Sequence, residues 1–242
     1  MSQMQSSATD TGSDPYARVY DNFYRVERAG VVRLSDGGGP FGFDISVALL
    51  MHDLITAYGC DAIIETGTFL GDTTVYLART YSHLPVWTCD IDEQAIGVAR
   101  RRLRDLPNAR SECMDSPGLV KEAVEKFERP IFYLDAHWDV SWPLQEELEL
   151  INNGIVCIDD FDIGHPRFAY DVYDGVPCGP AQLVPLASRA PVYFTFNAAA
   201  PLPYPCLQTG RRAGVGVVPF GTEATTACRS QYLVRHANRP VS

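Results

Sequence analysis

The sequence lacks several features that would place a protein in common functional classes. No apolar run among its 242 residues approaches the length of a membrane-spanning helix, and the first residues lack the basic and apolar regions of a secretory signal. None of the seven cysteines belongs to a Cys-x-x-Cys pair, which favours reduced thiols over a disulfide framework. We therefore expect a cytoplasmic protein in which residues 1–14, rich in Ser, Gln, Thr and Asp, form a disordered leader.

Positive charge is also scarce. The 20 Lys and Arg residues are outnumbered by 30 Asp and Glu, so the formal net charge is -10 and the overall field repels phosphate backbones and anionic lipids. The one basic cluster, Arg100-Arg101-Arg102 with Arg104, falls on a predicted helix, where a solvated face is the simpler interpretation. We expect no nucleic-acid partner and no membrane association, and the sequence leaves a homo-oligomer open.

The hydrophobic pattern predicts one α/β domain, because strand-like and helix-like segments alternate along most of the chain. The domain is expected over residues 15–242, with an N-terminal cap (15–44), a core (45–220) and a tail (221–242). The predicted strands cover residues 61–65, 86–90, 109–114, 131–135, 155–159, 192–196 and 215–220. The predicted helices cover residues 47–58, 72–82, 93–105, 117–128, 142–152 and 181–188, with either Asp139 or Ser141 capping the helix over 142–152.

The most informative stretch is Ile63-Ile64-Glu65-Thr66-Gly67-Thr68-Phe69-Leu70-Gly71. A buried strand ends in an acid and is followed by a turn with two glycines, where a ligand can approach the backbone closely. The spacing differs from the Gly-x-Gly-x-x-Gly dinucleotide fingerprint, and no Gly-Lys-Ser/Thr of a P-loop is present. An acid beside the first glycine would repel a pyrophosphate and suits a cationic ligand.

This stretch resembles motif I of the class I S-adenosylmethionine-dependent methyltransferases, whose acid-Gly pair lies beside the methionine end of the cofactor. The resemblance implies a seven-stranded Rossmann-like sheet with helices on both faces and its last strand antiparallel. It also implies that S-adenosylmethionine contacts the motif I residues Glu65, Thr66, Gly67, Gly71 and Thr73.

The ends of the next strands supply further cofactor candidates. Asp90 ends the second strand about 20 residues past the turn, where Rossmann-like folds place a carboxylate on the ribose hydroxyls. Asp92 is expected to cap the following helix. By the resemblance, Asp115 or Ser116 lies where this family contacts the adenine, and Asp135 is a position that class I enzymes commonly use for the cofactor.

Two later strands end in acids, Asp135 after one and Asp159-Asp160 after the other. If the strands are neighbours, these carboxylates converge and repel one another unless a cation binds or a proton is shared. Oxygen ligands suit Mg²⁺, with Mn²⁺ or Ca²⁺ as alternatives, and do not suit zinc. The pattern resembles the metal-binding positions of the catechol and caffeoyl-CoA O-methyltransferases, although capping or pairing with an arginine would also explain Asp159 and Asp160.

The catechol enzyme carries Asp-His-Trp-Lys at the first of these positions, with the lysine as base. Here an alanine intervenes in Asp135-Ala136-His137-Trp138, and Asp139 replaces the lysine, so His137 becomes the candidate catalytic base. His165 is the second choice.

The segment over residues 163–175 is long for a strand-to-helix connection and aromatic, which is typical of a substrate wall or lid. It supplies the candidate substrate contacts Arg167, Tyr170 and Tyr173. A loop that packs on its own aromatic residues is the alternative interpretation.

We therefore expect an S-adenosylmethionine-dependent O-methyltransferase that modifies a hydroxyl of a small molecule, such as a sugar or a natural-product intermediate, with help from a divalent metal. Three alternatives stay open: a metal-independent methyltransferase that uses His137 as base, an NAD(P)-dependent oxidoreductase, and a non-catalytic cofactor-binding protein.

Overall fold

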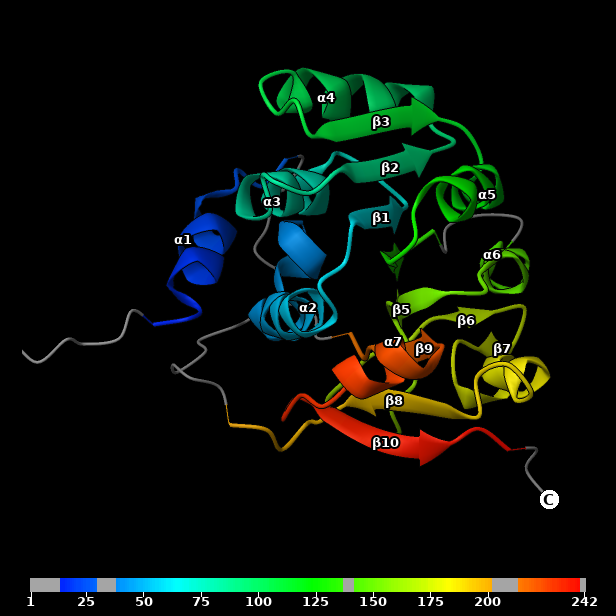
Figure 1. The fold of residues 1–242 in the computed structure, drawn as a ribbon. Helices are drawn as coiled ribbons and strands as arrows, with labels where there is room; N and C mark the ends of the chain where they lie inside the picture. Colours follow the sequence, from blue (N-terminus) through cyan, green and yellow to red (C-terminus); the bar gives the residue numbers. More distant parts are fainter. Residues whose placement is uncertain (1–13, 30–37, 137–141, 202–212, 240–242) are drawn as a thin grey trace, which may run out of the picture.

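A mostly parallel sheet forms the centre of the computed structural model, which describes residues 14–29, 38–136, 142–201 and 213–239 (Figure 1). The eight strands of this sheet are β1 (Ala62–Thr66), β2 (Val86–Asp90), β3 (Ala109–Cys113), β4 (Pro130–Leu134), β5 (Gly154–Ile158), β8 (Val192–Phe196), β9 (Gly216–Phe220) and β10 (Leu233–Ala237). A separate two-stranded hairpin consists of β6 (Val172–Tyr173) and β7 (Val176–Pro177).

The strand order is β10-β8-β9-β5-β4-β1-β2-β3. Strands β1 to β5 pair in parallel, whereas β9 is antiparallel to both β5 and β8. The predicted fold class is confirmed, and β10 adds an eighth strand, antiparallel to β8, in the stretch that we expected to be a tail. Strands β2 and β3 lie on one side of β1, and the chain then crosses to place β4 on the other side. The carboxyl ends of β1 and β4 therefore flank the usual ligand-binding crevice of such sheets.

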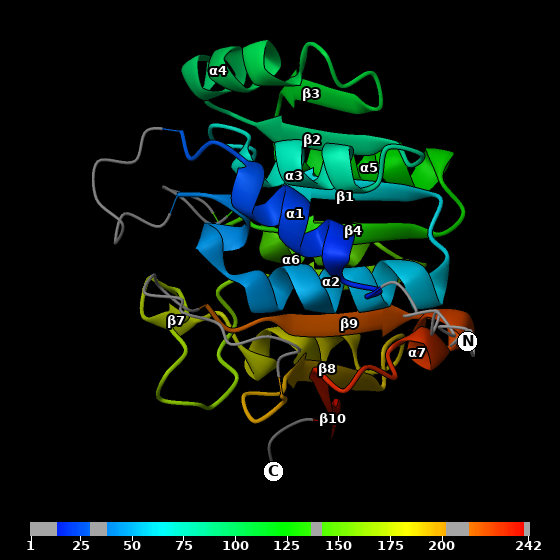
Figure 2. The same ribbon diagram turned by 90° about the vertical axis from the view of Figure 1, so that its left-hand side faces the viewer.

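The helices cover both faces of this sheet. The α-helices are α1 (Ala17–Arg25), α2 (Ile45–Tyr58), α3 (Asp72–Thr80), α4 (Glu93–Leu103), α5 (Ser116–Lys126), α6 (Leu144–Leu150) and α7 (Thr222–Ala227), and the 3-10 helices are η1 (Pro40–Phe43) and η2 (Pro180–Leu186). Figure 1 shows α1, α2 and α3 on one side of the sheet and α5 and α6 on the other. The turned view of Figure 2 places α1 and α2 in front of the strands.

Alternate side chains of the central strands point to opposite faces of the sheet and pack into two separate hydrophobic cores. Ile63 and Ile131 belong to the cluster that includes α2 and α3, whereas Ile64 and Phe132 belong to the cluster that includes α5 and α6. All four side chains are fully buried. Burial on both faces explains why β1, β4 and β5 are almost continuous apolar runs until their last residues.

Short polar side chains fix where several helices begin. Asp92 accepts hydrogen bonds from the amides of Gln94 (2.8 Å) and Ala95 (3.3 Å) at the start of α4, which confirms the cap predicted there. Asp44 accepts the amide of Ser46 at the start of α2 (2.9 Å). These caps set the positions from which each helix crosses back over the sheet.

Two predicted helices differ from what the structure shows. The predicted helix over residues 181–188 is the 3-10 helix η2, because Pro185 inside it has no amide to donate to an α-helical carbonyl. Helix α6 begins at Leu144 and not at residue 142. The candidate caps of that helix, Asp139 and Ser141, lie outside the described residues.

Candidate functional site

Gly67 makes the tight turn that follows β1. Its φ is +83°, and a Cβ added there would collide with the backbone carbonyl of Asp135. The amides of Gly67 and Thr68 both donate to the Cys89 carbonyl (3.0 Å each), so the turn is fixed against the end of β2. Gly71, with φ +81°, precedes α3. Gly67 therefore lets the ends of β1, β2 and β4 approach one another closely.

Glu65 is a buried carboxylate at the end of β1. It lies opposite Thr88 on β2 and Tyr133 on β4 in the sheet register, and it accepts a hydrogen bond from the Thr74 hydroxyl of α3. Burial raises the pKa of Glu65 to about 7, although the hydrogen bonds from Thr74 and Thr88 lower it. An ionised carboxylate in this place gains most from a cationic ligand beside it.

Asp90 holds the turn with both of its carboxylate oxygens. Oδ2 accepts the Phe69 amide at 2.7 Å, and Oδ1 accepts the Asp92 amide at 3.0 Å. Each oxygen keeps a second lone pair that can accept from a ribose hydroxyl. Asp90, the residue predicted to bind the ribose, thus lies beside the turn and stabilises its backbone.

The other predicted cofactor residues also have hydrogen-bonding tasks within the protein. Asp115 caps α5 by accepting the Gly118 amide (2.9 Å), and Thr73 accepts the Phe41 amide (3.0 Å). Thr66 accepts the amide of Asp135 (3.3 Å). All of these residues lie at the carboxyl ends of β1, β3 and β4 or at the starts of the helices that follow.

Glu147 is a buried acid that the sequence reasoning missed. It lies on α6 and is fully buried. Burial raises the pKa of Glu147 to about 7, while the nearby hydroxyls of Ser116 and Thr66 lower it. The signal was present in the sequence, because Leu144, Glu147, Leu148 and Ile151 follow helical spacing and share the buried face.

The two raised pKa values predict an unusual pH dependence of folding. Between pH 4.5 and 7 the folded protein retains protons on Glu65 and Glu147 that the unfolded chain releases. Stability of the ligand-free protein should therefore fall as pH rises through this window, by about 3 kcal/mol for each group. Urea denaturation at pH 5 and pH 8 measures the difference. Glu147→Gln should show a shallower decline, and a wild-type protein that becomes more stable toward pH 8 would contradict this account.

Three carboxylates meet where β4 and β5 end. The register pairs Leu134 with Ile158, so the next residues, Asp135 and Asp159, are neighbours. One oxygen from each of Asp135, Asp159 and Asp160 lies within 4.8 Å of the others. Burial, followed by the charges of Asp159 and Asp160, raises the pKa of Asp135 well above its usual range. The predicted convergence of these three acids is therefore what the structure shows.

The chemistry of this acid cluster fits a hard divalent cation. Asp159 and Asp160 are buried, and Asp160 has a left-handed backbone with φ +49°. Three carboxylates can share this volume if a proton is shared or a cation compensates their charge. An all-oxygen donor set of this kind suits Mg²⁺ or Mn²⁺.

The predicted base, His137, lies outside the described residues. His165, the second choice, accepts the Arg167 amide through Nδ1 (3.2 Å) and packs edge-on against Phe168 with the ring centroids 5.5 Å apart. Its imidazole is thus used locally to shape the segment that follows β5.

The segment after β5 is attached to the acid cluster. The Asp171 amide donates to the Asp160 carbonyl (2.9 Å), and the Cys178 amide donates to the Asp171 carbonyl (2.8 Å). Of the predicted substrate contacts, Tyr170 is exposed, whereas the Tyr173 ring stacks on Trp142 with centroids 6.0 Å apart. Arg167 donates to the Ala198 carbonyl (3.1 Å). The segment therefore lies beside the cluster, in a position to form a wall.

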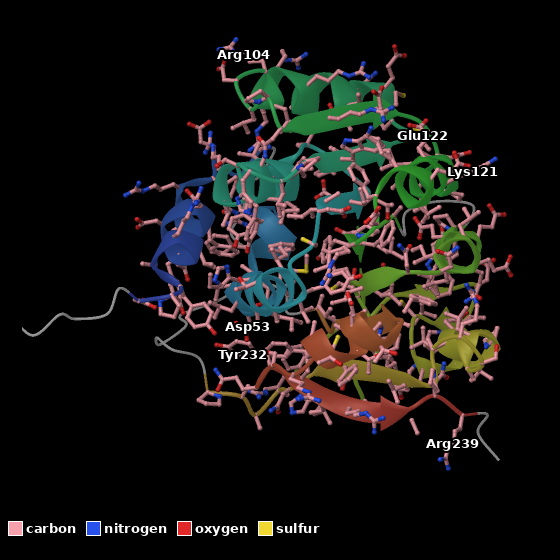
Figure 3. All side chains as sticks on the ribbon, viewed as in Figure 1. Asp53, Arg104, Lys121, Glu122, Tyr232 and Arg239 are labelled. Carbon is pink, nitrogen blue, oxygen red and sulfur yellow. The ribbon has the colours of Figure 1, made fainter. Side chains whose placement is uncertain are left out.

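A separate cleft lies away from the acid cluster. It has a volume of about 720 Å³ and is lined by residues of α2 and α7, among them His52 and Asp53, together with Arg129. Asp53, labelled in Figure 3, accepts hydrogen bonds from Tyr16 (2.8 Å) and Ser230 (2.6 Å). Arg129 directly precedes β4, so this cleft is at the amino ends of the parallel strands, opposite the acid cluster.

Comparison with protein-family profiles and with the sequences of curated proteins gave no match. Several solved structures have a similar fold. They include an O-methyltransferase from Bacillus cereus bound to SAH (17% identity over 72% of this chain and 80% of that one, TM-score 0.49). They also include a putative O-methyltransferase from Klebsiella pneumoniae (16% identity, 89% and 93% covered, TM-score 0.48) and TomG from Streptomyces achromogenes bound to SAM (19% identity, 72% and 78% covered, TM-score 0.47).

The strand order of this chain, with β9 inserted antiparallel between β5 and β8 and the switch point between β1 and β4, is the order that the resemblance to the class I methyltransferases implies. In the part of the chain that the structure describes, no helix is both long and apolar enough to cross a bilayer. The six cysteines described there are free thiols.

Proposed function

We propose that the protein is an S-adenosylmethionine-dependent O-methyltransferase that acts on a hydroxyl of a small molecule with the help of a divalent metal. One observation carries the proposal: Asp135 contacts both the Gly67–Gly71 turn and the acid cluster. The backbone of Asp135 packs against Gly67, while its carboxylate belongs to the cluster with Asp159 and Asp160. A methyl donor held by the turn would therefore lie next to an acceptor held at the cluster.

Each residue then has a defined task. Glu65 faces the positive charge of the cofactor, Asp90 accepts from its ribose, and Ser116 with Asp115 lies on the side where the adenine would bind. Asp135, Asp159 and Asp160 would hold Mg²⁺, with Mn²⁺ or Ca²⁺ as alternatives, and a metal bound there lowers the pKa of a coordinated hydroxyl. His137 would accept the hydroxyl proton, and Arg167, Tyr170 and Tyr173 would contact the acceptor.

The net charge and the free thiols indicate the class of acceptor and the compartment that suit this activity. A net charge of -10 disfavours nucleic acids and anionic membranes as partners, so the acceptor is a small hydroxylated molecule such as a sugar or a natural-product intermediate. Free cysteines are stable in a reducing compartment, and we place the protein in the cytoplasm.

Transfer of a labelled methyl group tests the proposal directly. Purified protein is incubated with methyl-labelled S-adenosylmethionine and a panel of diols, phenols and sugars, with Mg²⁺ or with EDTA. We expect labelled product with Mg²⁺ and at least a 100-fold lower rate with EDTA, since the hydroxyl then keeps its unperturbed pKa. Restoring Mg²⁺ should restore the rate, which controls for damage to the protein.

The other outcomes of this experiment select the alternatives. Equal rates with and without EDTA would show that the reaction needs no metal, and would favour a metal-independent enzyme with His137 as the base. Cofactor binding without transfer to any acceptor would favour a binding protein. Binding of NADH, followed by fluorescence, in place of S-adenosylmethionine would favour an oxidoreductase.

A further inference from the structure

Asp72, the first residue of α3, binds the backbone of the N-terminal region. Its carboxylate is largely buried and follows the Gly67–Gly71 turn directly. Oδ1 accepts the Ala29 amide (3.2 Å), and Oδ2 accepts the Gly39 amide (2.6 Å). The next residue, Thr73, accepts the Phe41 amide through its hydroxyl (3.0 Å). Two adjacent side chains of α3 therefore hold three N-terminal amides that are far away in the sequence.

Arg102 of α4 joins this arrangement to the turn. Its Nη1 donates to Asp72 Oδ1 and to the Leu70 carbonyl, both at 2.5 Å, and its Nη2 donates to the Glu27 carbonyl at 2.5 Å. The ion pair is mostly buried, with 17% of the Arg102 side chain and 11% of the Asp72 side chain exposed. The Arg102 guanidinium thus connects the Gly67–Gly71 turn, the start of α3 and the N-terminal region.

The attached residues reach the centre of the site. Phe41, Gly42 and Phe43 follow Gly39 with left-handed φ values of 53°, 61° and 65°. The buried Phe41 ring packs edge-on against Tyr133, with centroids 5.0 Å apart. Tyr133 lies opposite Glu65 in the sheet and two residues before Asp135 in the chain. Such backbone conformations persist where the surroundings enforce them, and they cluster at ligand sites.

We infer that Asp72, Thr73 and Arg102 form a clamp that makes residues 27–29 and 38–43 a wall of the cofactor site. The inference rests on the proposed function. The clamp residues are positioning residues, because they act through the turn and through Phe41. Loss of the clamp leaves Glu65 and the acid cluster in place but releases the wall and the Leu70 carbonyl. It should therefore lower cofactor affinity by a larger factor than the rate of the chemical step.

The test compares the wild-type protein with Arg102→Met, Thr73→Val and a matched control, Arg101→Met. Arg101 is the neighbouring arginine of α4, and it is exposed and forms no ion pair with a described residue. Hydrogen exchange of the Ala29, Gly39 and Phe41 amides reports whether the clamp is closed. Calorimetry with S-adenosylhomocysteine reports cofactor affinity, and steady-state kinetics separate the KM for S-adenosylmethionine from kcat.

We expect Arg102→Met to speed exchange at Ala29 and Gly39, to weaken S-adenosylhomocysteine binding by about tenfold and to raise the cofactor KM by a similar factor. The kcat should fall less than threefold. Thr73→Val should speed exchange at Phe41 and weaken binding by about threefold, so it tests the clamp even if Arg102→Met does not fold. Arg101→Met should match the wild type.

Three results would overturn the inference. Faster exchange at the clamp amides with unchanged affinity would show that the wall is separate from the cofactor site. Unchanged exchange in both variants would show that the clamp does not hold the N-terminal region, and equal weakening in Arg101→Met would assign the effect to general charge. A wild-type protein that does not bind S-adenosylhomocysteine would refute the proposed function itself, and the inference with it.

Discussion

Replacing Asp159 or Asp160 with asparagine is expected to lower metal-dependent kcat/KM by about 1000-fold, a loss of about 4 kcal/mol of transition-state stabilisation. Each substitution removes one charged ligand from a cluster whose three oxygens lie within 4.8 Å of one another. Asparagine keeps the shape of the side chain, and it tolerates the left-handed backbone of residue 160. The loss should therefore report on charge and ligation and not on misfolding.

The same variants should become more stable when no metal is present. Like charges in the buried cluster repel one another, so removing one of them relieves the ligand-free protein. Thermal unfolding should show a higher Tm without metal and a smaller Mg²⁺-dependent increase than in the wild type. Higher stability combined with lower activity distinguishes a metal-binding carboxylate from a structural one, whose loss would lower both.

Asp162→Asn is the matched control, because Asp162 follows the same strand but does not belong to the cluster. Its Oδ1 accepts the Gly164 amide at 2.8 Å, and an asparagine oxygen can replace it there. The control should keep the wild-type rate and its Mg²⁺ response. Full activity of both Asp159→Asn and Asp160→Asn would refute the metal site.

Local patterns were sufficient to predict the parts of the site that follow directly from strand ends. Glu65, Asp90 and Asp135 follow short, mostly apolar runs, and parallel strands bring their carboxyl ends to one edge of the sheet. The register then makes Asp135 and Asp159 neighbours. These residues were predictable because strand period and sheet direction determine where they lie.

The tasks of Asp72 and Arg102 could not be predicted in the same way. The amides that Asp72 accepts come from Ala29 and Gly39, which are 43 and 33 residues away, and Arg102 is 30 residues away on another helix. No local pattern encodes such pairings, so the basic cluster containing Arg102 was interpreted as a solvated face. That interpretation is wrong for Arg102, which is mostly buried in its ion pair.

Strand β10 was missed for a related reason. Its residues Leu233–Ala237 include Arg235 and His236, and the strand is at the edge of the sheet with much of its surface exposed. Its position depends on pairing with β8, where the Thr195 hydroxyl and His236 Nε2 lie 2.8 Å apart. An edge strand with little buried apolar surface gives a weak hydrophobic pattern.

Gly67→Ala is expected to lower both the stability of the fold and its affinity for the cofactor. The new Cβ would collide with the Asp135 carbonyl, and the residue would also have to keep φ at +83°. A left-handed alanine costs about 1–2 kcal/mol and overpacking adds about 1–3 kcal/mol, so the free energy of unfolding should fall by about 2–5 kcal/mol. Relief of the collision would move the turn away from Asp135, so S-adenosylhomocysteine affinity should fall by about 100-fold or more.

Gly59→Ala separates the two contributions. Gly59 ends α2 with φ +59°, but a Cβ there would meet no atom within 4 Å. Its substitution should therefore cost only the backbone term of about 1–2 kcal/mol and leave cofactor affinity unchanged. Urea denaturation and calorimetry on both variants give the comparison. Equal affinity of Gly67→Ala and Gly59→Ala for S-adenosylhomocysteine would show that cofactor binding does not need close contact between the turn and Asp135. The proposed position of the methyl donor next to the acid cluster would then be refuted.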